Sequence, residues 1–287
     1  MYFSRIFGAV PSFASNRSRI ARVFFELLTR IAFLYTVGGV SSDKTSSASV
    51  PGLVIERTAQ VLTFTLDNAD QGNQVTGAMF DAMLATLREE ANRPSARVLR
   101  IRAGGKVFCT GRERAARDVE SLRKEASRII EVKRSLRTSP LISIAEVQGD
   151  AFGFGFGLAI LCDFVLVAEH ASLKFPEMRS GLPPAAIMAY LGEYALPRFT
   201  FPLVLFGDPI TPQAALQIGL ISQVCSANRL SEEADALTAR ILQLDPTAAR
   251  RCKEFFQTTQ QNNFAQNCRL AIDALTVSSL TVLAREK

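Results

Sequence analysis

Short apolar segments that alternate with helix-like segments constrain the fold of this chain more than any other feature. Runs of β-branched and other apolar residues predict strands at 53–57, 60–66, 98–103, 141–147, 163–169 and 172–175. Between and after these runs, the spacing of apolar residues predicts helices. Strands that alternate with helices, followed by a helical tail, are typical of an α/β domain with a helical C-terminal part.

Several of the helical segments carry start signals. Thr76 can cap a helix whose apolar residues recur every four positions, and Thr211 with Pro212 is a favourable helix start. The remaining predicted helices cover about 113–137, 229–243, 246–260 and 263–279. With 287 residues, 48% of them hydrophobic, the chain can bury a large core. We divide it into an N-terminal segment at 1–50, an α/β core at 51–205 and a helical region at 206–287.

The first fifty residues differ from the rest in charge. They carry six basic and two acidic residues, whereas the other residues carry 27 and 25, so the net charge of +6 lies mostly in this segment. Residues 19–34 predict a cationic amphipathic helix, and the polar run 41–49 predicts a flexible linker. Three interpretations stay open: a targeting peptide, a helix that touches a membrane or a partner, or a start codon assigned too far upstream.

Composition excludes several functions. The five cysteines are an odd number, lie far apart and form no CxxC pair, which is typical of reduced thiols in a cytoplasmic compartment. Cys109 and Cys162 are predicted core residues. His170 is the only histidine, so a histidine-based metal cluster is excluded and no metal is expected. The body of the chain is nearly neutral, so no nucleic-acid partner is expected either.

Two glycine-containing loops follow predicted strands, KVFCTGRE at 106–113 and GDAFGFGFG at 149–157. Neither fits a phosphate loop or the dinucleotide fingerprint, and no GxSxG motif is present. Each loop is followed by a predicted helix, and the first turn of a helix presents unpaired N–H groups. Two such loops could hold an oxyanion between one N–H from each, or they could be ordinary turns. The spacing of the glycines alone does not decide between these alternatives.

The three longest motifs together resemble the crotonase superfamily, also called the enoyl-CoA hydratase/isomerase family. They are VLTFTLDNADQGNQVTGAMFDAML, VLRIRAGGKVFCTGRE and ISIAEVQGDAFGFGFGLAILCDFVLVAEHASLKFPEMRSGLPP. The similarity extends from about Val54 to the C-terminal helices, and the motifs occur in the family's order. The resemblance implies a spiral of ββα turns, a C-terminal helical trimerisation region, and a homotrimer or a pair of trimers. It also implies an acyl-CoA thioester substrate, with coenzyme A as part of the substrate and no separate cofactor.

The resemblance assigns roles to the two glycine loops. The thioester oxygen would lie between the backbone N–H groups of Arg112 and Phe154, with Gly111, Gly153 and Gly155 shaping the binding loops. The family usually has glycine at the Phe154 position, so the phenyl ring is expected to point away from the oxyanion. The Arg112 position usually holds a small residue, and the arginine side chain could meet a phosphate of coenzyme A.

The acid–base residues depart from the family pattern. Its hydratases use two glutamates; one of these positions is Gly157 here, and the other matches Glu177. A single carboxylate such as Glu177 can take a proton from one carbon and return it to another, which suits isomerisation of 3-enoyl-CoA to 2-enoyl-CoA better than hydration. The alternatives are a hydratase with a relocated second carboxylate, for which Asp150, Glu113 and Glu193 are candidates, or a crotonase-fold protein that binds acyl-CoA, RNA or a partner without turnover. The expected location is cytoplasmic, or organellar if residues 1–50 are a targeting peptide.

Overall fold

The computed structural model describes residues 46–285. The cationic helix predicted within residues 1–50 therefore lies outside the described residues. Within the described part of the chain, no helix is both long and apolar enough to span a membrane.

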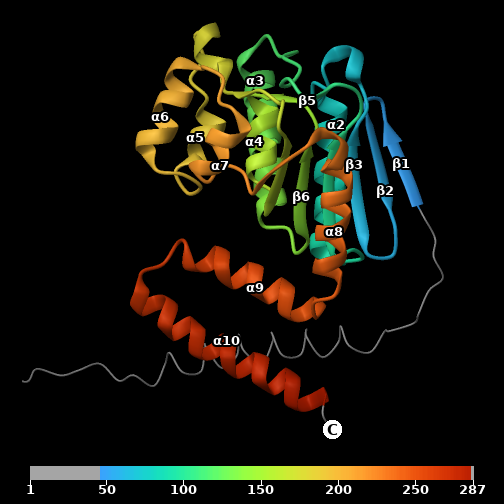
Figure 1. The fold of residues 1–287 in the computed structure, drawn as a ribbon, viewed down its shortest axis with the longest axis vertical. Helices are drawn as coiled ribbons and strands as arrows, with labels where there is room; N and C mark the ends of the chain where they lie inside the picture. The colour runs from blue at the N-terminus through green and yellow to red at the C-terminus, as the bar shows by residue number, and fades with distance from the viewer. Residues whose placement is uncertain (1–45, 286–287) are drawn as a thin grey trace, which may run out of the picture. The chain divides into compact units, whose positions relative to one another are not determined.

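A seven-stranded mixed sheet forms the centre of the described unit (Figure 1). Its strands run in the order β1 (Ser46–Val50), β2 (Leu53–Arg57), β3 (Val61–Leu66), β4 (Val98–Ala103), β6 (Ile142–Val147), β8 (Phe164–Ala168) and β10 (Gln223–Cys225). The first three strands are antiparallel, and all later pairs are parallel. The α/β prediction is confirmed, as are the strands predicted at 53–57, 60–66, 98–103, 141–147 and 163–169.

Two segments of this sheet contradict the sequence-based assignment. The polar run 41–49 was predicted as a linker, but its second half forms β1, which pairs with β2 from Ser46↔Arg57 to Val50↔Leu53. Strand β10 lies in a stretch that was predicted to be mostly helical, and it pairs with β8. Each strand pairs with the unpaired backbone N–H and C=O groups of its neighbour. Backbone hydrogen bonds depend little on side-chain type, so the sequence pattern does not reveal these strands.

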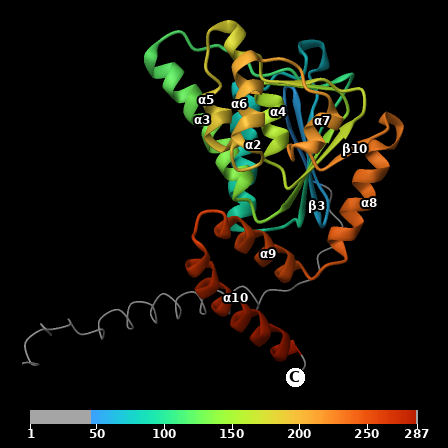
Figure 2. The same ribbon diagram turned by 60° about the vertical axis from the view of Figure 1, so that its left-hand side comes forward.

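Helices cover both faces of the large sheet. Helices α2 (Gly77–Asn92) and α3 (Val119–Arg137) contact each other, and α2 also lies against β1. On the other face, α8 (Leu230–Leu242) packs on β4, β6 and β8. Figure 2 shows α8 on the side of the sheet away from α2 and α3. Two apolar clusters result, because alternate residues of a strand point to opposite faces: Leu99 joins the larger cluster and its neighbour Val98 the cluster under α8.

The caps fix where the helices begin. The Thr76 hydroxyl accepts a hydrogen bond from the N–H of Met79, as the sequence predicts. Helix α3 was predicted from about residue 113, but it starts at Val119, where the Asp118 carboxylate accepts from the N–H of Ser121 at 2.9 Å. The preceding residues 113–118 form no helix, and the N–H of Glu113 donates to the carbonyl of Val75.

A second, three-stranded parallel sheet carries the motifs. It consists of β5 (Val107–Cys109), β7 (Asp150–Phe152) and β9 (Leu173–Lys174), with β7 in the centre. The segment 106–113 was predicted as a loop, but part of it, Val107–Cys109, forms β5. The short helix α4 (Phe154–Ile160) follows β7 directly, and the 3-10 helix η2 (Pro176–Ser180) follows β9. Parallel strands end at the same sheet edge, so the residues after these three strands lie together.

The C-terminal region is mainly helical, as predicted. Residues 206–287 contain α7 (Pro212–Gln217), α8, α9 (Pro246–Thr259) and α10 (Phe264–Arg285), and α5 (Ala185–Leu191) and α6 (Pro197–Phe206) precede them. Helices α9 and α10 lie side by side (Figures 1 and 2). Lys253 ties α9 to the core, because its amine donates to the carbonyl of Leu141 at 2.6 Å and to the carboxylate of Asp163 at 2.7 Å.

Candidate active site

A cavity of about 770 Å³ lies where the three strands of the small sheet end. Arg112 follows β5, Phe154 follows β7 and Glu177 follows β9, and all three residues line this cavity. The volume is within the usual range for pockets that bind small molecules. The small sheet therefore brings together the three predicted catalytic residues, which are far apart in the sequence.

Two glycines set the geometry at the start of α4. Gly153 has φ +53, and a Cβ there would lie 2.7 Å from Oε1 of Glu177, so a side chain would be both strained and in contact with the carboxylate. A Cβ on Gly155 would lie 2.3 Å from the carbonyl oxygen of Cys109. Gly111 and Gly153 line the cavity, but Gly155 does not. Gly155, predicted to shape the binding loop, permits close contact between α4 and β5.

The backbone N–H groups of Arg112 and Phe154 donate no hydrogen bond within the described residues. For Arg112 the cause is the bridge with Val75, which uses the carbonyl of Gly111 and the N–H of Glu113 and leaves the Arg112 N–H on the other side. Arg112 therefore does not lie at the start of a helix. The prediction that a helix follows each loop directly holds for Phe154 but not for Arg112. Both residues nevertheless line the same cavity.

The Glu177 carboxylate is half-buried and incompletely paired. Its Oε2 is buried and has no hydrogen-bond partner. Burial raises the pKa of Glu177 above its ordinary value, although its own N–H and the charges of Lys133, Arg114 and Arg112 oppose that shift. A raised pKa makes a carboxylate a stronger base toward carbon acids, and it is typical of groups that transfer protons.

The Phe154 ring is turned into the protein, as expected. It meets the ring of Phe80 edge to face, with centroids 5.0 Å apart, and only 6% of the residue is exposed. The next phenylalanine of the motif, Phe156, is fully buried and stacks on Phe175. The alternating phenylalanines therefore fill the core and one cavity wall, while the glycines between them keep the backbone close to its neighbours.

Comparison with known proteins identifies the family. The enoyl-CoA hydratase/isomerase family model matches residues 56–281. The chain belongs to this family. It is 28% identical over 217 residues to the 2,3-dehydroadipyl-CoA hydratase of Escherichia coli. The aligned region covers 73% of this chain and 83% of that protein. It is 25% identical to a zebrafish (Danio rerio) protein named enoyl-CoA hydratase domain-containing protein 3, mitochondrial, over 83% of each chain.

Solved structures of the family share the fold. The putative enoyl-CoA hydratase from Thermobifida fusca, solved in complex with CoA, superposes with a TM-score of 0.75 and 26% identity, covering 82% of this chain and 95% of that one. An enoyl-CoA hydratase from Mycobacterium smegmatis superposes with a TM-score of 0.76 over 80% of this chain and 91% of that one, at 23% identity. The predicted crotonase-like fold is thereby confirmed.

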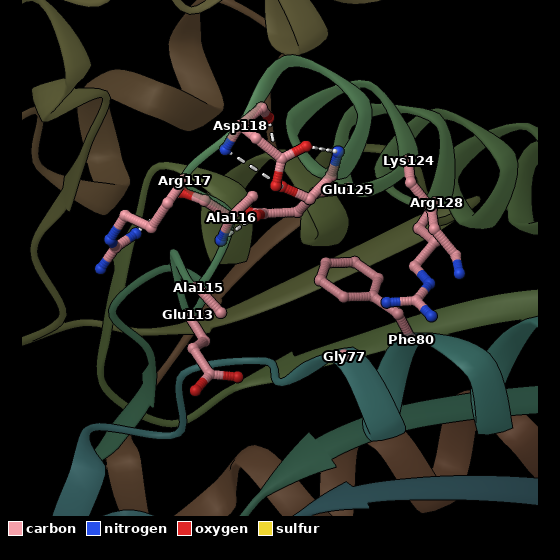
Figure 3. A pocket seen from close by; sticks show the side chains of 11 residues that line it. Gly77, Phe80, Glu113, Ala115, Ala116, Arg117, Asp118, Lys124, Glu125 and Arg128 are labelled. Atoms are coloured by element: carbon pink, nitrogen blue, oxygen red, sulfur yellow. Dashed lines mark hydrogen bonds between the residues drawn. The ribbon is translucent and has the colours of Figure 1, made fainter.

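Within the family's site, none of the candidate replacement carboxylates lines the cavity. Asp150 accepts from the N–H of Ser172 at 3.0 Å, and Glu193 pairs with Arg137. Glu113 belongs to a second cavity of about 420 Å³, and Figure 3 shows its carboxylate directed away from Glu125 at the opposite side of that cavity. Glu177 is therefore the only carboxylate that lines the first cavity among the described residues.

The two arginines that line the cavity differ in whether their side chains already have a partner. The Arg112 guanidinium forms an ion pair with Glu125 and donates to the carbonyl of Glu113 at 3.1 Å, so its side chain is already engaged. Arg114 is exposed, lines the cavity, and has no carboxylate partner among residues 46–285. The expectation that an arginine meets a CoA phosphate therefore fits Arg114 better than Arg112.

Sequence inspection missed Lys133 and Tyr190. Lys133 lines the cavity although only 4% of the residue is exposed, and its amine donates to the Tyr190 hydroxyl at 2.8 Å. A signal existed, because Lys133 falls four residues after Ile129 and three before Leu136, on the buried stripe of α3. A lysine in an apolar stripe is unusual unless it has a partner.

Among residues 46–285, no three potential metal-ligating side chains cluster together.

Proposed function

We propose that this member of the family isomerises 3-enoyl-CoA thioesters to 2-enoyl-CoA thioesters. The observation that carries the proposal is a single carboxylate, Glu177, in a family-type cavity where the other family glutamate is replaced by Gly157. Allylic isomerisation needs one base that can take a proton from the carbon next to the thioester. Hydration through two carboxylates needs a second one, and none lines the cavity among the described residues.

In the proposed reaction, the thioester oxygen accepts hydrogen bonds from the N–H groups of Arg112 and Phe154. Their lack of partners within the described residues supports this role. Glu177 removes a proton from C2, and the electron pair of the C–H bond forms an enolate. Donors directed at the developing charge lower the barrier by about 3–4 kcal/mol each in measured oxyanion holes. Protonation of the enolate at C4 moves the double bond into conjugation.

The charges around the cavity support an anionic thioester as substrate. Its lining contains three cations, Arg112, Arg114 and Lys133, and one carboxylate, Glu177. Because Arg114 is exposed and has no carboxylate partner within the described part of the chain, we propose that it contacts a phosphate of coenzyme A. The apolar part of the lining, including Ile129, would surround the acyl chain.

Hydration of a 2-enoyl-CoA is the second candidate. It is favoured by the names of the relatives, since the Escherichia coli relative is a hydratase. The absence of a second carboxylate from the lining disfavours it. Assays with matched 2-enoyl and 3-enoyl substrates separate the two reactions directly.

The C-terminal helices support a homotrimer or a pair of trimers. Seven large apolar side chains of α10 are exposed in the single chain: Phe264, Leu270, Ile272, Leu275, Leu280, Val282 and Leu283. Exposed apolar clusters of this extent on a helix are typical of a protein interface. We therefore propose that α10 contributes to the subunit contact.

We propose that residues 1–50 act as a targeting peptide that directs the protein to an organelle. The name of the zebrafish relative includes the word mitochondrial, and the segment here is basic and poor in acids. A fluorescent reporter fused to residues 1–50 is expected to enter an organelle. A diffuse cytoplasmic signal would contradict this part of the proposal.

The test of the function compares wild-type protein with Glu177→Gln on 3-enoyl-CoA and 2-enoyl-CoA thioesters. Isomerisation by the wild type and a loss of at least ~100-fold in the variant are expected, since general acid–base groups contribute at least that much. Glu113→Gln is the matched control and should keep full activity, because Glu113 lies in the other cavity. Efficient hydration without isomerisation, or acyl-CoA binding without turnover, would refute the proposed reaction.

A further inference from the structure

The space beside Gly157 is already occupied by polar groups from two other helices. A Cβ on Gly157 would lie 2.6 Å from the Tyr190 hydroxyl oxygen, 3.0 Å from the Lys133 amine nitrogen and 3.1 Å from a side-chain carbon of Ile187. Lys133 comes from α3 and Tyr190 from α5. An amine and a hydroxyl therefore fill the position where the side chain of a glutamate at residue 157 would begin.

Hydrogen bonds hold this pair in a defined orientation. The Lys133 amine donates to the Tyr190 hydroxyl at 2.8 Å and to the carbonyl of Ala186 at 3.3 Å. The Tyr190 hydroxyl in turn donates to the carbonyl of Gly157 at 2.8 Å. An ammonium has three N–H groups, so one is left without an acceptor within the described residues. Because Lys133 lines the cavity, that third position is available to a substrate.

Lys133 is buried without a carboxylate to balance its charge. No carboxylate lies within ion-pair distance of its amine among residues 46–285, and its nearest aromatic neighbours are the rings of Tyr190 at 4.8 Å and Phe154 at 5.5 Å. Burying a cation without a carboxylate partner is costly, and a methionine would fill similar space without that cost. A costly polar group that lines a cavity is better explained by chemistry than by packing.

Lys133 lies beside Gly157 of α4, a position that fits the far end of a thioester enolate. Gly157 follows Phe154 by three residues, which is about 4.5 Å along a helix axis. Glu177, by contrast, stands against Gly153, immediately beside the Phe154 N–H. A substrate whose oxygen meets that N–H would have C2 near Glu177 and C4 further along the helix, near Lys133.

We propose that Lys133 is the second proton-transfer group of this site and takes the place of the glutamate missing at Gly157. The inference rests on the proposed isomerisation and assigns its second step. Glu177 takes the C2 proton and becomes a neutral acid. The enolate then reforms the C1–O double bond, C2–C3 becomes the double bond, and the π electrons of C3–C4 bond to a proton from the Lys133 ammonium at C4. A proton returns from Glu177 to the neutral amine through water before the next turnover.

The electrostatic environment suits a lysine that must release a proton. Burial lowers the pKa of Lys133 to about 7, although the charge of Glu177 opposes this shift. The other ionisable groups that face the cavity are Arg112 and Arg114, and Tyr190 bonds the amine directly. Isomerisation that needs the ammonium is therefore expected to fall as the pH rises above about 7.

Two rates measured on one substrate test the inference. The first is exchange of the C2 protons of a 3-enoyl-CoA with D2O, which needs Glu177 and the oxyanion donors. The second is isomerisation, which also needs the C4 proton. In Lys133→Met, isomerisation should fall by ~100-fold or more while C2 exchange stays within a few-fold of wild type. Lys124→Met, an exposed lysine on the same helix, should change neither rate.

Two further variants distinguish proton transfer from a positioning role. Lys133→Arg keeps a positive charge but cannot release its proton, so it should not restore isomerisation. Tyr190→Phe removes the hydroxyl that orients the amine and should lower isomerisation more than exchange. The decline in rate above pH 7 should be absent from the residual activity of Lys133→Met.

Each possible failure has a separate meaning. If the wild type isomerises but Lys133→Met lowers isomerisation and exchange equally, or lowers neither, or Lys133→Arg is fully active, the role of Lys133 is refuted and the proposed function stands. If the wild type neither exchanges C2 protons nor isomerises any 3-enoyl-CoA, the proposed function is wrong and the inference falls with it.

Discussion

Substitution of Gly155 by alanine tests whether the contact between α4 and β5 positions the oxyanion donors. An added Cβ would lie 2.3 Å from the carbonyl oxygen and 2.6 Å from the Cβ of Cys109, whereas ordinary contacts begin at 3.4 Å. The two segments must therefore separate by roughly 1 Å, the difference between 3.4 and 2.3 Å. Because the first clash is with backbone, a rotamer change cannot relieve it. Overpacking of this kind costs about 1–3 kcal/mol of unfolding free energy.

The same displacement should reduce catalysis. Gly155 follows Phe154 directly, and Cys109 precedes Arg112 by three residues. Forcing the two segments apart thus increases the separation of the two N–H groups that are proposed to hold the thioester oxygen. A misplacement of about 1 Å can cost ~100-fold in rate. We expect Gly155→Ala to lose isomerisation by about that factor while it still folds.

Gly192→Ala is the matched control for this experiment. Gly192 ends α5 with φ −67, and an added Cβ would meet nothing within 4 Å. Thermal unfolding followed by circular dichroism should show a lower Tm for Gly155→Ala only, by about 2–4 °C for each kcal/mol lost. If Gly155→Ala matches Gly192→Ala in both Tm and turnover, the close contact does not position the donors and the reasoning is wrong.

Three further outcomes are expected. Because burial raises the pKa of Glu177, the native state binds this proton more tightly than the unfolded chain does. Its contribution to stability therefore decreases as the pH rises above about 4.5, so Glu177→Gln should raise Tm relative to wild type more at pH 8 than at pH 5. Lys253→Met removes the donor to Leu141 and Asp163 and should cost about 2 kcal/mol in urea unfolding, and an unchanged midpoint would contradict this. Replacing Ile272 and Leu275 by aspartate should convert the oligomer to monomers in light scattering, and an unchanged mass would exclude this face of α10 from the interface.

Much of the fold could be predicted from local sequence patterns. Apolar runs predict the central strands correctly because each strand buries its own side chains. Thr76 and Thr211 mark helix starts because the cap is a local hydrogen bond. The start of α3 was predicted six residues too early, since residues 113–118 are charged like a helix surface but bond to Val75 and Glu125. Strands β1, β5 and β10 were missed because backbone pairing with distant strands stabilises them.

The candidate site was predicted from sequence only where a motif is continuous. The loops around Arg112, Phe154 and Glu177 follow strands whose ends can be read along the chain, so the resemblance could assign them. The role of Gly155 depends on the approach of Cys109, which lies 46 residues earlier in the chain (155 minus 109). That role was therefore predicted only in part.

The sequence by itself determined that this chain builds an α/β core, that glycines interrupt its phenylalanines at 153, 155 and 157, and that no carboxylate stands at residue 157. Only the tertiary structure decided what occupies the vacated position. Lys133 and Tyr190 lie on separate helices, and no spacing along the chain relates either of them to Gly157. They meet because α3 and α5 both pack against α4, where the absence of a side chain leaves room for an amine and a hydroxyl.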